Sequence, residues 1–389
     1  MTGSSTQTTD PTLEMFAELL PGALEDSADP AAQKAALDDF LAYGLPHRKL
    51  EAWKYTNITK AVQGPFTRPH SGAWALKFPD EVKLKMITTF PVIGKDQPFA
   101  LLSRALTHGG IELTVPPNTV VKDLVEIGLP VAKANTLFCP TLVIRVGAGS
   151  KVDFVVRSGE QGEGSLVSLI AEMDVGENAS ASLTKIRTGS GAHFTHMQTR
   201  QAAGSHLELF DFTRGGTLTR NDLNARVDGE GAEVDVHGLY VLNGTSHADH
   251  HTAVEHAVPN TVSRQLYKGI VNERACGVFN GRIIVDPGAS GTDALQMNRN
   301  LLGGKGRVDT KPQLEIANDD VRCAHGATIG RLDETQLFYL QSRGLDPVAA
   351  EAILARGFAG EALDCIRNPA VRAEIDLLAE AFFDGTNHE

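Results

Sequence analysis

The chain has 389 residues, enough for two or three domains or for one long repeat structure, and its 42% hydrophobic and 22% charged residues are typical of a globular protein. Its formal net charge of −12 disfavours binding to nucleic acid, which needs clustered Lys and Arg. No apolar run approaches the roughly 18 to 20 residues that cross a bilayer, so we expect no membrane association either.

Two features bear on the cell compartment. The first 33 residues contain no Lys or Arg, so they do not offer the positively charged start of a secretory signal. The four cysteines lie far apart, which is typical of thiols kept reduced in a cytosol rather than of a disulfide framework. We therefore expect a cytoplasmic protein.

The first part of the chain has patterns typical of helices, over residues 13–24 and 30–42. Asp29 has the side chain of an N-cap, Pro30 follows at the first helical position, and Gly44 stands where a helix would stop. These residues predict a helical region before the β-forming part of the chain begins.

Near residue 141 the pattern changes to short runs of β-forming residues separated by Gly, Ser, Asn and Asp. The runs include TLVIRV, KVDFVV, HLELFDF, AEVDVHGLYVL and GRIIV. No convincing helix interrupts them before residue 330, which argues against alternating strands and helices.

A loose repeat passes through this β-forming region. Four dipeptides, each preceding an alternating segment, recur at spacings of 29, 26 and 27 residues: Gly149-Ser150, Asn178-Ala179, Gly204-Ser205 and Gly231-Ala232. A period in the twenties indicates a solenoid, and short strands with Gly or Asn at the corners predict a β-helix whose coils lie about 4.8 Å apart. A β-sandwich with accidental spacing is the alternative. The terminal coils of a β-helix expose unpaired N–H and C=O groups, so each end needs a cap or a partner chain.

The last part of the chain is again expected to be helical. Asp333 has the position of an N-cap for one helix, and a second helix should run from Pro347 to a stop near Gly357. Further helical stretches are expected over residues 360–365 and 370–383.

These patterns predict a mainly β protein in three parts. Residues 1–75 form an N-terminal helical region, residues 76–330 a β-helix core, and residues 331–389 a C-terminal helical domain.

Cys323 and His325 are the strongest candidates for a functional site. In an extended segment, residues i and i+2 point to the same face, so a Cys-Ala-His triplet on a strand presents a thiol and an imidazole side by side. Such ligands suit iron, zinc or copper(I). Two ligands are too few for a closed tetrahedral site, so either another chain supplies the rest or the two residues simply pack in a core.

A second group of candidate ligands comprises His247, Asp249, His250, His251 and His256, which could suggest zinc. On a strand, His247 and His251 share one face, while His250 and His256 share the other. This alternation divides the group, so we favour stacked or surface histidines over a catalytic metal.

An enzyme remains the alternative from a different functional class, as a Cys- or zinc-dependent hydrolase on a β-helix. No nucleophile elbow, P-loop or dinucleotide fingerprint stands in the required strand-to-helix context. Asp319 and Asp320 precede Cys323 and should raise its thiol pKa, which disfavours an activated nucleophile.

Residues 247–344 resemble the SufB/SufD family of iron-sulfur cluster assembly scaffolds. The matching segments are HTAVEHAVPNTVSRQLYKGIV, GVFNGRIIV, QMNRNLL, DTKPQLEI, DDVRCAHGATIG and QLFYLQSRG, and GLPHRKLEAWKYT is similar to the amino-terminal region of the family. The SufB branch typically has His-Glu-Ala-Thr where this chain has His325-Gly326-Ala327-Thr328. The chain therefore resembles the SufD branch, and the missing Glu argues against an independent cluster-building role.

The resemblance implies a right-handed parallel β-helix between two helical regions, in a subunit that is not itself an enzyme. It implies pairing with SufB through the β-helix ends and binding of the SufC ATPase through the C-terminal helices, and it leaves open whether the chain forms a homodimer without partners. Cys323 and His325 would then help to hold iron or a nascent iron-sulfur cluster at the SufB interface. In a second hypothesis, they only pack this interface and SufB supplies every ligand. Reduced flavin, linked to iron release, is a further component associated with such complexes.

Overall fold

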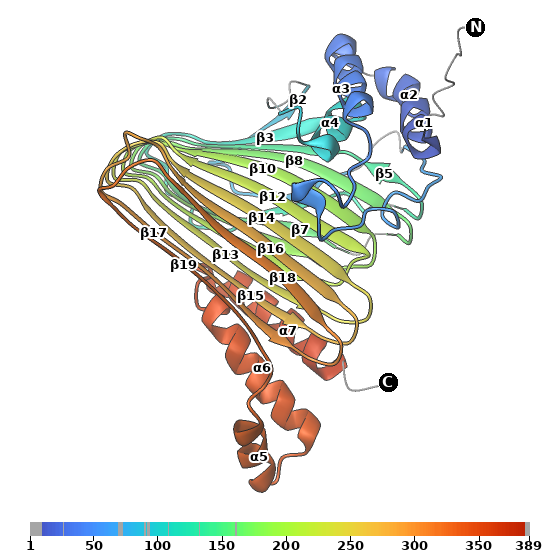
Figure 1. The fold of residues 1–389 in the computed structure, drawn as a ribbon. Helices are drawn as coiled ribbons and strands as arrows, with labels where there is room; N and C mark the ends of the chain where they lie inside the picture. The colour runs from blue at the N-terminus through green and yellow to red at the C-terminus, as the bar shows by residue number, and fades with distance from the viewer. Residues whose placement is uncertain are drawn as a thin grey trace, which may run out of the picture.

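A stack of parallel β-strand coils forms the centre of the computed structural model, with one group of helices against each of its two sheets (Figure 1). The structure describes residues 10–25, 27–68, 73–88, 91, 94–107, 109–131, 133–159 and 162–385. Successive strands from β6 onward alternate between the two sheets, and each pairs with the strand of the coil before it. The predicted parallel β-helix is therefore confirmed, and the β-sandwich alternative is wrong.

Each sheet is a ladder in which neighbouring strands belong to neighbouring coils. In spatial order, the nine-stranded sheet contains β1 (Ala75–Lys77), β4 (Val125–Gly128), β7 (Lys151–Ser158), β9 (Ser180–Arg187), β11 (His206–Arg214), β13 (Glu233–Leu242), β15 (Val262–Val271), β17 (Thr292–Leu302) and β19 (Val321–Gly330). The ten-stranded sheet contains β2 (Lys83–Ile87), β3 (Gly110–Val115), β6 (Thr141–Val146), β8 (Leu166–Val175), β10 (Ala192–Gln201), β12 (Leu218–Val227), β14 (His247–His256), β16 (Cys276–Val285) and β18 (Arg307–Ile316), with β5 (Leu137–Phe138) paired to β8.

The corners between strands explain the repeat in the sequence. Gly149, Asn178, Gly204 and Gly231 have φ angles of 67°, 54°, 62° and 69°, and each precedes a strand of the nine-stranded sheet. Gly adopts this left-handed conformation without a steric penalty, and Asn tolerates it better than other residues do. The corner conformation thus requires the residue types that recur at the predicted spacing.

The main hydrophobic core fills the interior of the coils. Val115, Val146 and Val175 are register neighbours on three consecutive strands of the ten-stranded sheet, and all three are buried. Burying one such side chain stabilises the fold by about 1.5 to 3 kcal/mol, so the stack itself accounts for much of the driving force.

The N-terminal helices cover the ten-stranded sheet. They are α1 (Pro11–Glu18), α2 (Leu20–Leu24), α3 (Pro30–Tyr43), the 3₁₀ helix η1 (Glu51–Trp53) and α4 (Pro98–Ala105). The helix predicted over 13–24 is in fact two helices that meet at Leu19, because Pro21 has no N–H to continue the ladder. The predicted start of α3 is confirmed, since the Asp29 side chain accepts a hydrogen bond from the Ala32 N–H.

Aromatic packing holds this region on the sheet. The rings of Phe99, on α4, and Phe194, on β10, are stacked with their centroids 3.6 Å apart. Trp53 is buried against both rings. These contacts join the N-terminal segment to the coils.

The C-terminal helices are α5 (Glu334–Ser342), α6 (Pro347–Leu363) and α7 (Pro369–Gly385). Asp333 caps α5, as predicted. The predicted stop near Gly357 and the separate helix over 360–365 are wrong, because α6 continues past Gly357 and ends at Leu363. Its buried Ala355 and Ala359 pack in one cluster with side chains of the nine-stranded sheet, and this tertiary packing outweighs the low helix propensity of glycine.

Candidate functional site

The two ends of the β-helix are finished differently. At the N-terminal end, β1 and β2 pair antiparallel with the sheets; they are only 3 and 5 residues long and carry Lys side chains. At the other end, β18 and β19 have 10 residues each, and each pairs with a single strand in the described structure. Short, Lys-bearing edges discourage strand pairing, whereas long open edges favour it. The C-terminal end is therefore the open end.

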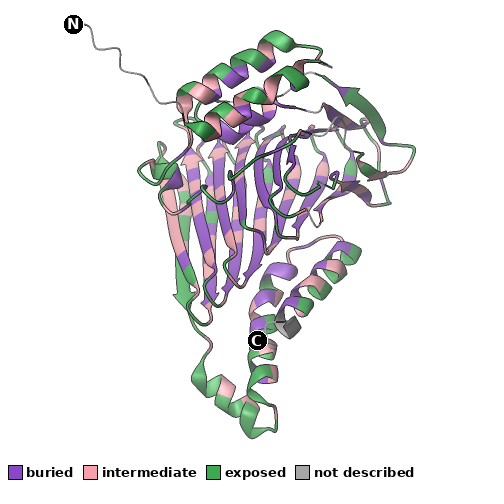
Figure 2. Cartoon of the chain, turned by 90° about the vertical axis from the view of Figure 1, so that its right-hand side faces the viewer, coloured by how far each residue is buried: buried purple, intermediate pink, exposed green. Residues whose placement is uncertain are grey.

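The open end is also the least covered part of the coils. Ile316, on β18, and Ile329, on β19, are 43% and 47% exposed, and exposed residues follow the terminal strand in Figure 2. One coil further in, Gln296 and Asn298 of β17 are fully buried. A matching surface placed on this end would bury the same side chains that an additional coil would cover.

Cys323 and His325 both lie on β19, at this open end. Cys323 is the register partner of Ala294, and His325 is the register partner of Gln296. Ala294 and Gln296 are buried inside the coils. Their register partners Cys323 and His325 therefore lie on the face of β19 that points toward the interior of the stack. The structure thus places both candidates on one face of one strand, with His325 exposed and Cys323 half-buried.

The surroundings of the Cys323 thiol oppose its ionisation. The side chain packs against a small cluster that includes Ile283, Val285 and Ala294. Burial raises the pKa of the thiol and the charge of Asp293 raises it further, although a hydrogen bond to the Ala294 backbone opposes this shift. The acidic neighbour is therefore Asp293, on the adjacent strand. The thiolate would need a cation or a metal beside it.

Gln296 is a candidate residue that the sequence interpretation did not single out. It has no exposed surface, and neither atom of its side-chain amide has a hydrogen-bond partner among the described residues. A Cβ at Gly281, on the opposite sheet, would lie 1.5 Å from Gln296 Nε2, so the amide crosses the interior of the coil. Buried amides in proteins are almost always bonded. The open end therefore has an unpartnered donor and acceptor next to His325 in the ladder.

The histidines of β14 occupy two separate environments, as their alternation predicted. His250 faces inward and stacks on Tyr240 with a ring separation of 5.2 Å, and burial lowers its pKa to about 4. His256 also faces inward, with its ring nitrogens 2.7 Å from Thr261 Oγ1 and 2.9 Å from Ser263 Oγ.

The outward-facing residues of β14 belong to a buried charge network. His251 Nε2 lies 2.9 Å from Asp249 Oδ1, and Arg220 Nη1 donates to Asp249 Oδ2 at 2.7 Å. Burial alone would raise the pKa of Asp249, but the charges of His251 and Arg220 hold it well below its usual range. Thr56 also donates to Asp249, which connects the N-terminal segment to the coils. The contacts of this network join separate elements of the fold to one another.

Comparison with known proteins identifies the family of this chain. The sequence model described as "SUF system FeS cluster assembly, SufBD core domain" matches residues 130–358, and the chain belongs to this family. It is an iron-sulfur cluster assembly protein of the SUF system, as the resemblance in the sequence indicated.

Individual relatives agree with this assignment. The iron-sulfur cluster assembly protein SufD of Escherichia coli is 29% identical over 386 residues, which cover 89% of this chain and 91% of the relative. SufD of Bacillus subtilis is 29% identical over 66% of this chain and 60% of its own length. A SufBD family protein of Synechocystis is 38% identical over 51% of this chain, and the match spans only 45% of that relative.

None of the helices within the described ranges has the length and apolar character needed to span a bilayer.

Proposed function

We propose that this SUF protein is a non-catalytic scaffold subunit that works in the cytoplasm. In this proposal, it pairs with a SufB-type chain through the open end of its β-helix and binds the SufC ATPase through its C-terminal helices. The parts 1–75, 76–330 and 331–389 would then serve as an anchoring region, a core that carries the interface, and a docking domain. The near full-length similarity to a protein named SufD supports the subunit type.

The difference between the two ends of the β-helix supports the pairing and is the observation that carries the proposal. The N-terminal end has short antiparallel strands, while β18 and β19 leave two ten-residue edges open. A second β-helix placed end to end would supply the missing hydrogen bonds and bury Ile316 and Ile329.

The side chains at the open end support a shared cargo site. Cys323 and His325 offer one sulfur and one nitrogen ligand, and Gln296 offers an unpartnered amide behind them. Iron or a nascent cluster needs more protein ligands than these, so the partner chain has to provide the remainder. The cluster is then cargo at a subunit interface rather than a resident cofactor.

The C-terminal helices support a separate docking surface. Helix α5, which is described along its whole length, has no buried residue, and its Phe338 and Tyr339 are 72% and 61% exposed. On α6, Val348 and Ile353 are also exposed. The α5 end of this region extends away from the coils in Figure 1, where an ATPase could bind without covering the open end. Exposed aromatic residues of this kind are typical of protein interfaces.

The ligand assignment is tested by co-purifying the chain with SufB and SufC chains and reconstituting a cluster without oxygen. Cys323→Ser and His325→Ala are expected to reduce cluster yield while leaving the complex intact. Cys276→Ser is the matched control, because Cys276 is also half-buried on a strand but lies on β16, one coil inward of the open edge at β18. Normal yield in both variants at the open end would refute the assignment and favour the purely structural scaffold.

The pairing is tested separately by placing charges on the open edges. The double variant Ile316→Asp and Ile329→Asp should prevent complex formation with SufB while the isolated chain still folds, because both side chains are already partly exposed. A complex that forms normally would contradict pairing at this end. The oligomeric state of the isolated wild-type chain, measured by light scattering, shows whether the same edges pair in a homodimer.

A hydrolase would be detected with the isolated chain. Stoichiometric zinc together with turnover of ester or peptide substrates would support that alternative. The raised pKa of the Cys323 thiol argues against it. Titration of the assembled complex with reduced flavin tests whether this component binds at all.

A further inference from the structure

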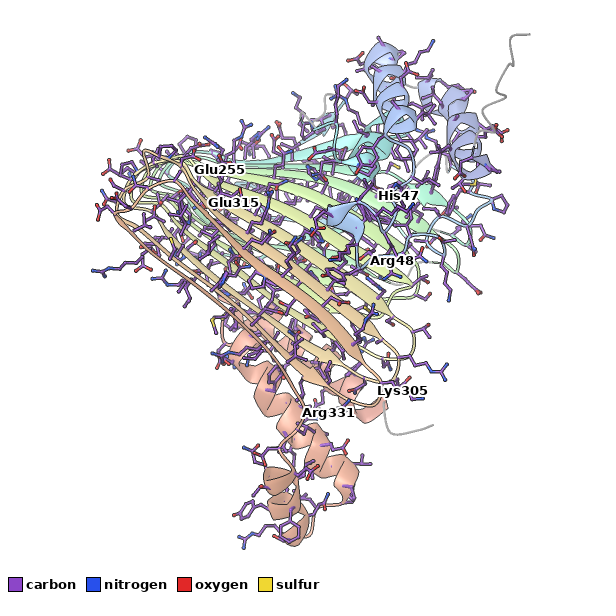
Figure 3. All side chains as sticks on the ribbon, viewed as in Figure 1. His47, Arg48, Glu255, Lys305, Glu315 and Arg331 are labelled. Atoms are coloured by element: carbon purple, nitrogen blue, oxygen red, sulfur yellow. The ribbon has the colours of Figure 1, made fainter. Side chains whose placement is uncertain are left out.

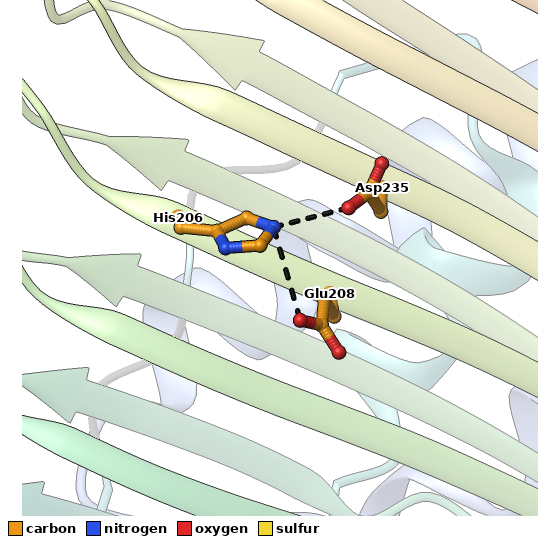
Figure 4. Close-up of side chains that lie close together, drawn as sticks. All are labelled: His206, Glu208 and Asp235. Atoms are coloured by element: carbon orange, nitrogen blue, oxygen red, sulfur yellow. Dashed lines mark hydrogen bonds and ion pairs between the residues drawn. The ribbon is translucent and has the colours of Figure 1, made fainter. Parts of the chain in front are cut away.

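A cluster of three side chains with metal-binding groups lies far from the open end, on the outer face of the nine-stranded sheet. His206 Nε2 is 3.0 Å from Asp235 Oδ2 and 3.8 Å from Glu208 Oε1, and the ligand atoms of the three residues lie within 4.8 Å of one another. Figure 4 shows the same imidazole nitrogen facing both carboxylates. All three side chains are only partly buried, so ions can reach them from solvent.

The register of the strands brings two like charges together. Glu208, on β11, and Asp235, on β13, are direct partners in the parallel ladder. Like charges in this position destabilise a sheet unless a cation lies between them. Arg367, from the turn between α6 and α7, binds Glu208 and also lies 3.8 Å from Asp153. Three carboxylates against one guanidinium leave a formal charge of −2 when His206 is neutral.

The separations fit the coordination of a small divalent ion. Bonds of about 2.0 to 2.2 Å from one ion to nitrogen and oxygen ligands place those ligands roughly 2.9 to 3.5 Å apart, depending on the geometry. The observed 3.0 and 3.8 Å lie at or near this range, so small side-chain rotations would complete it.

The cluster combines one imidazole with two carboxylates. Imidazole is a ligand that zinc and iron(II) accept, whereas magnesium and calcium prefer oxygen ligands alone. The nitrogen of His206 therefore favours zinc or iron(II) at this position.

We propose that His206, Glu208 and Asp235 bind one divalent transition-metal ion, with Zn²⁺ as the best match, at the contact between the β-helix and the C-terminal helices. The ion would neutralise the paired carboxylates of β11 and β13. It would also strengthen the attachment of the α6–α7 turn, which reaches Glu208 through Arg367. This site is independent of the cargo site at the open end.

Calorimetric titration of the isolated full-length chain with ZnCl₂, after treatment with a chelator, tests the proposal. His206→Gln and Asp235→Asn should each weaken binding at one site by at least about tenfold, since even groups outside the first ligand shell change metal affinity by roughly 10- to 100-fold. His47→Ala is the control, because His47 is exposed in the N-terminal segment, away from the C-terminal helices (Figure 3). A large excess of Mg²⁺ should not displace the zinc.

The background for the titration is a chain carrying Cys323→Ser and His325→Ala, so that zinc at the open end does not contribute. Zinc should raise the melting temperature of this background protein and leave that of its His206→Gln derivative unchanged. Equal zinc affinity with and without His206→Gln, or displacement by Mg²⁺, would overturn the proposal and leave the cluster as an ion-pair network. If His206→Gln does not fold, the Asp235→Asn chain gives the same comparison.

Discussion

Replacing Arg220 with Met should destabilise the protein more than the loss of any other charged side chain described above. Arg220 is 3% exposed and donates to Asp222, Asp249 and the carbonyl of Ala52 at 2.7 to 2.9 Å. Its guanidinium also lies 3.9 Å from the centre of the Trp53 ring. Methionine fills a similar volume but removes the guanidinium partner of the fully buried Asp249.

The expected cost follows from the loss of this partner. Breaking a buried ion pair by removing one partner typically costs about 3 to 5 kcal/mol, because the remaining charge stays desolvated. The double variant Arg220→Met with Asp249→Asn removes that charge, so it should be more stable than the sum of the two single effects predicts, by about 0.5 to 3 kcal/mol. Arg145→Met is the matched control: Arg145 pairs with Glu172 and Asp174 at a more exposed position, and its loss should cost less than about 1 kcal/mol.

Urea unfolding followed by tryptophan fluorescence is a suitable assay, because Trp53 contacts Arg220 directly. The free energy of unfolding would be compared among the wild type, the two single variants and the double variant at neutral pH. Strictly additive effects would refute the reasoning that Arg220 acts through the buried charge of Asp249. A cost for Arg145→Met equal to that for Arg220→Met would refute the role of burial.

Three further predictions concern other parts of the chain. Burial lowers the pKa of His250 in the folded chain to about 4, so the unfolded chain binds a proton at this residue first as the pH falls below 6.5. The free energy of unfolding should therefore drop by about 1.5 kcal/mol between pH 6.5 and about pH 5. His250→Phe should remove this part of the pH dependence in urea titrations. Gln296→Met should stabilise the isolated chain by roughly 1 to 3 kcal/mol, since it removes an unpartnered buried amide, yet lower cluster yield in the complex; a less stable variant would show that the amide is bonded in the free chain. Phe338→Ser with Tyr339→Ser should abolish SufC binding in pull-down experiments without changing the melting temperature, and retained binding would place the ATPase elsewhere.

The sequence predicted the β-helix because its corners require particular residues. Gly149 and Asn178 recur where the backbone needs a positive φ, so the fold leaves a visible period. The sequence also predicted that Cys323 and His325 share one strand face, because this depends only on the alternation of side chains along one strand.

Other features depended on contacts between coils that a sequence period does not specify. Gln296 is the register partner of His325, and Glu208 is that of Asp235, but spacings that vary from 26 to 29 residues do not say which residues align. Helix α6 passed through Gly357 because packing on the sheet outweighed propensity. The strands β1 and β2 are too short to leave a clear alternating pattern.

The strict alternation of inward and outward side chains also limits how this rod can change its length. A single residue inserted within a strand would turn every later side chain of that strand to the wrong side, exposing valines and burying charges. Insertion of an entire coil preserves the facing of all its neighbours and lengthens the rod by about 4.8 Å. Length differences in the central part of related proteins should therefore come either as loop growth at the corners or as steps of one complete turn.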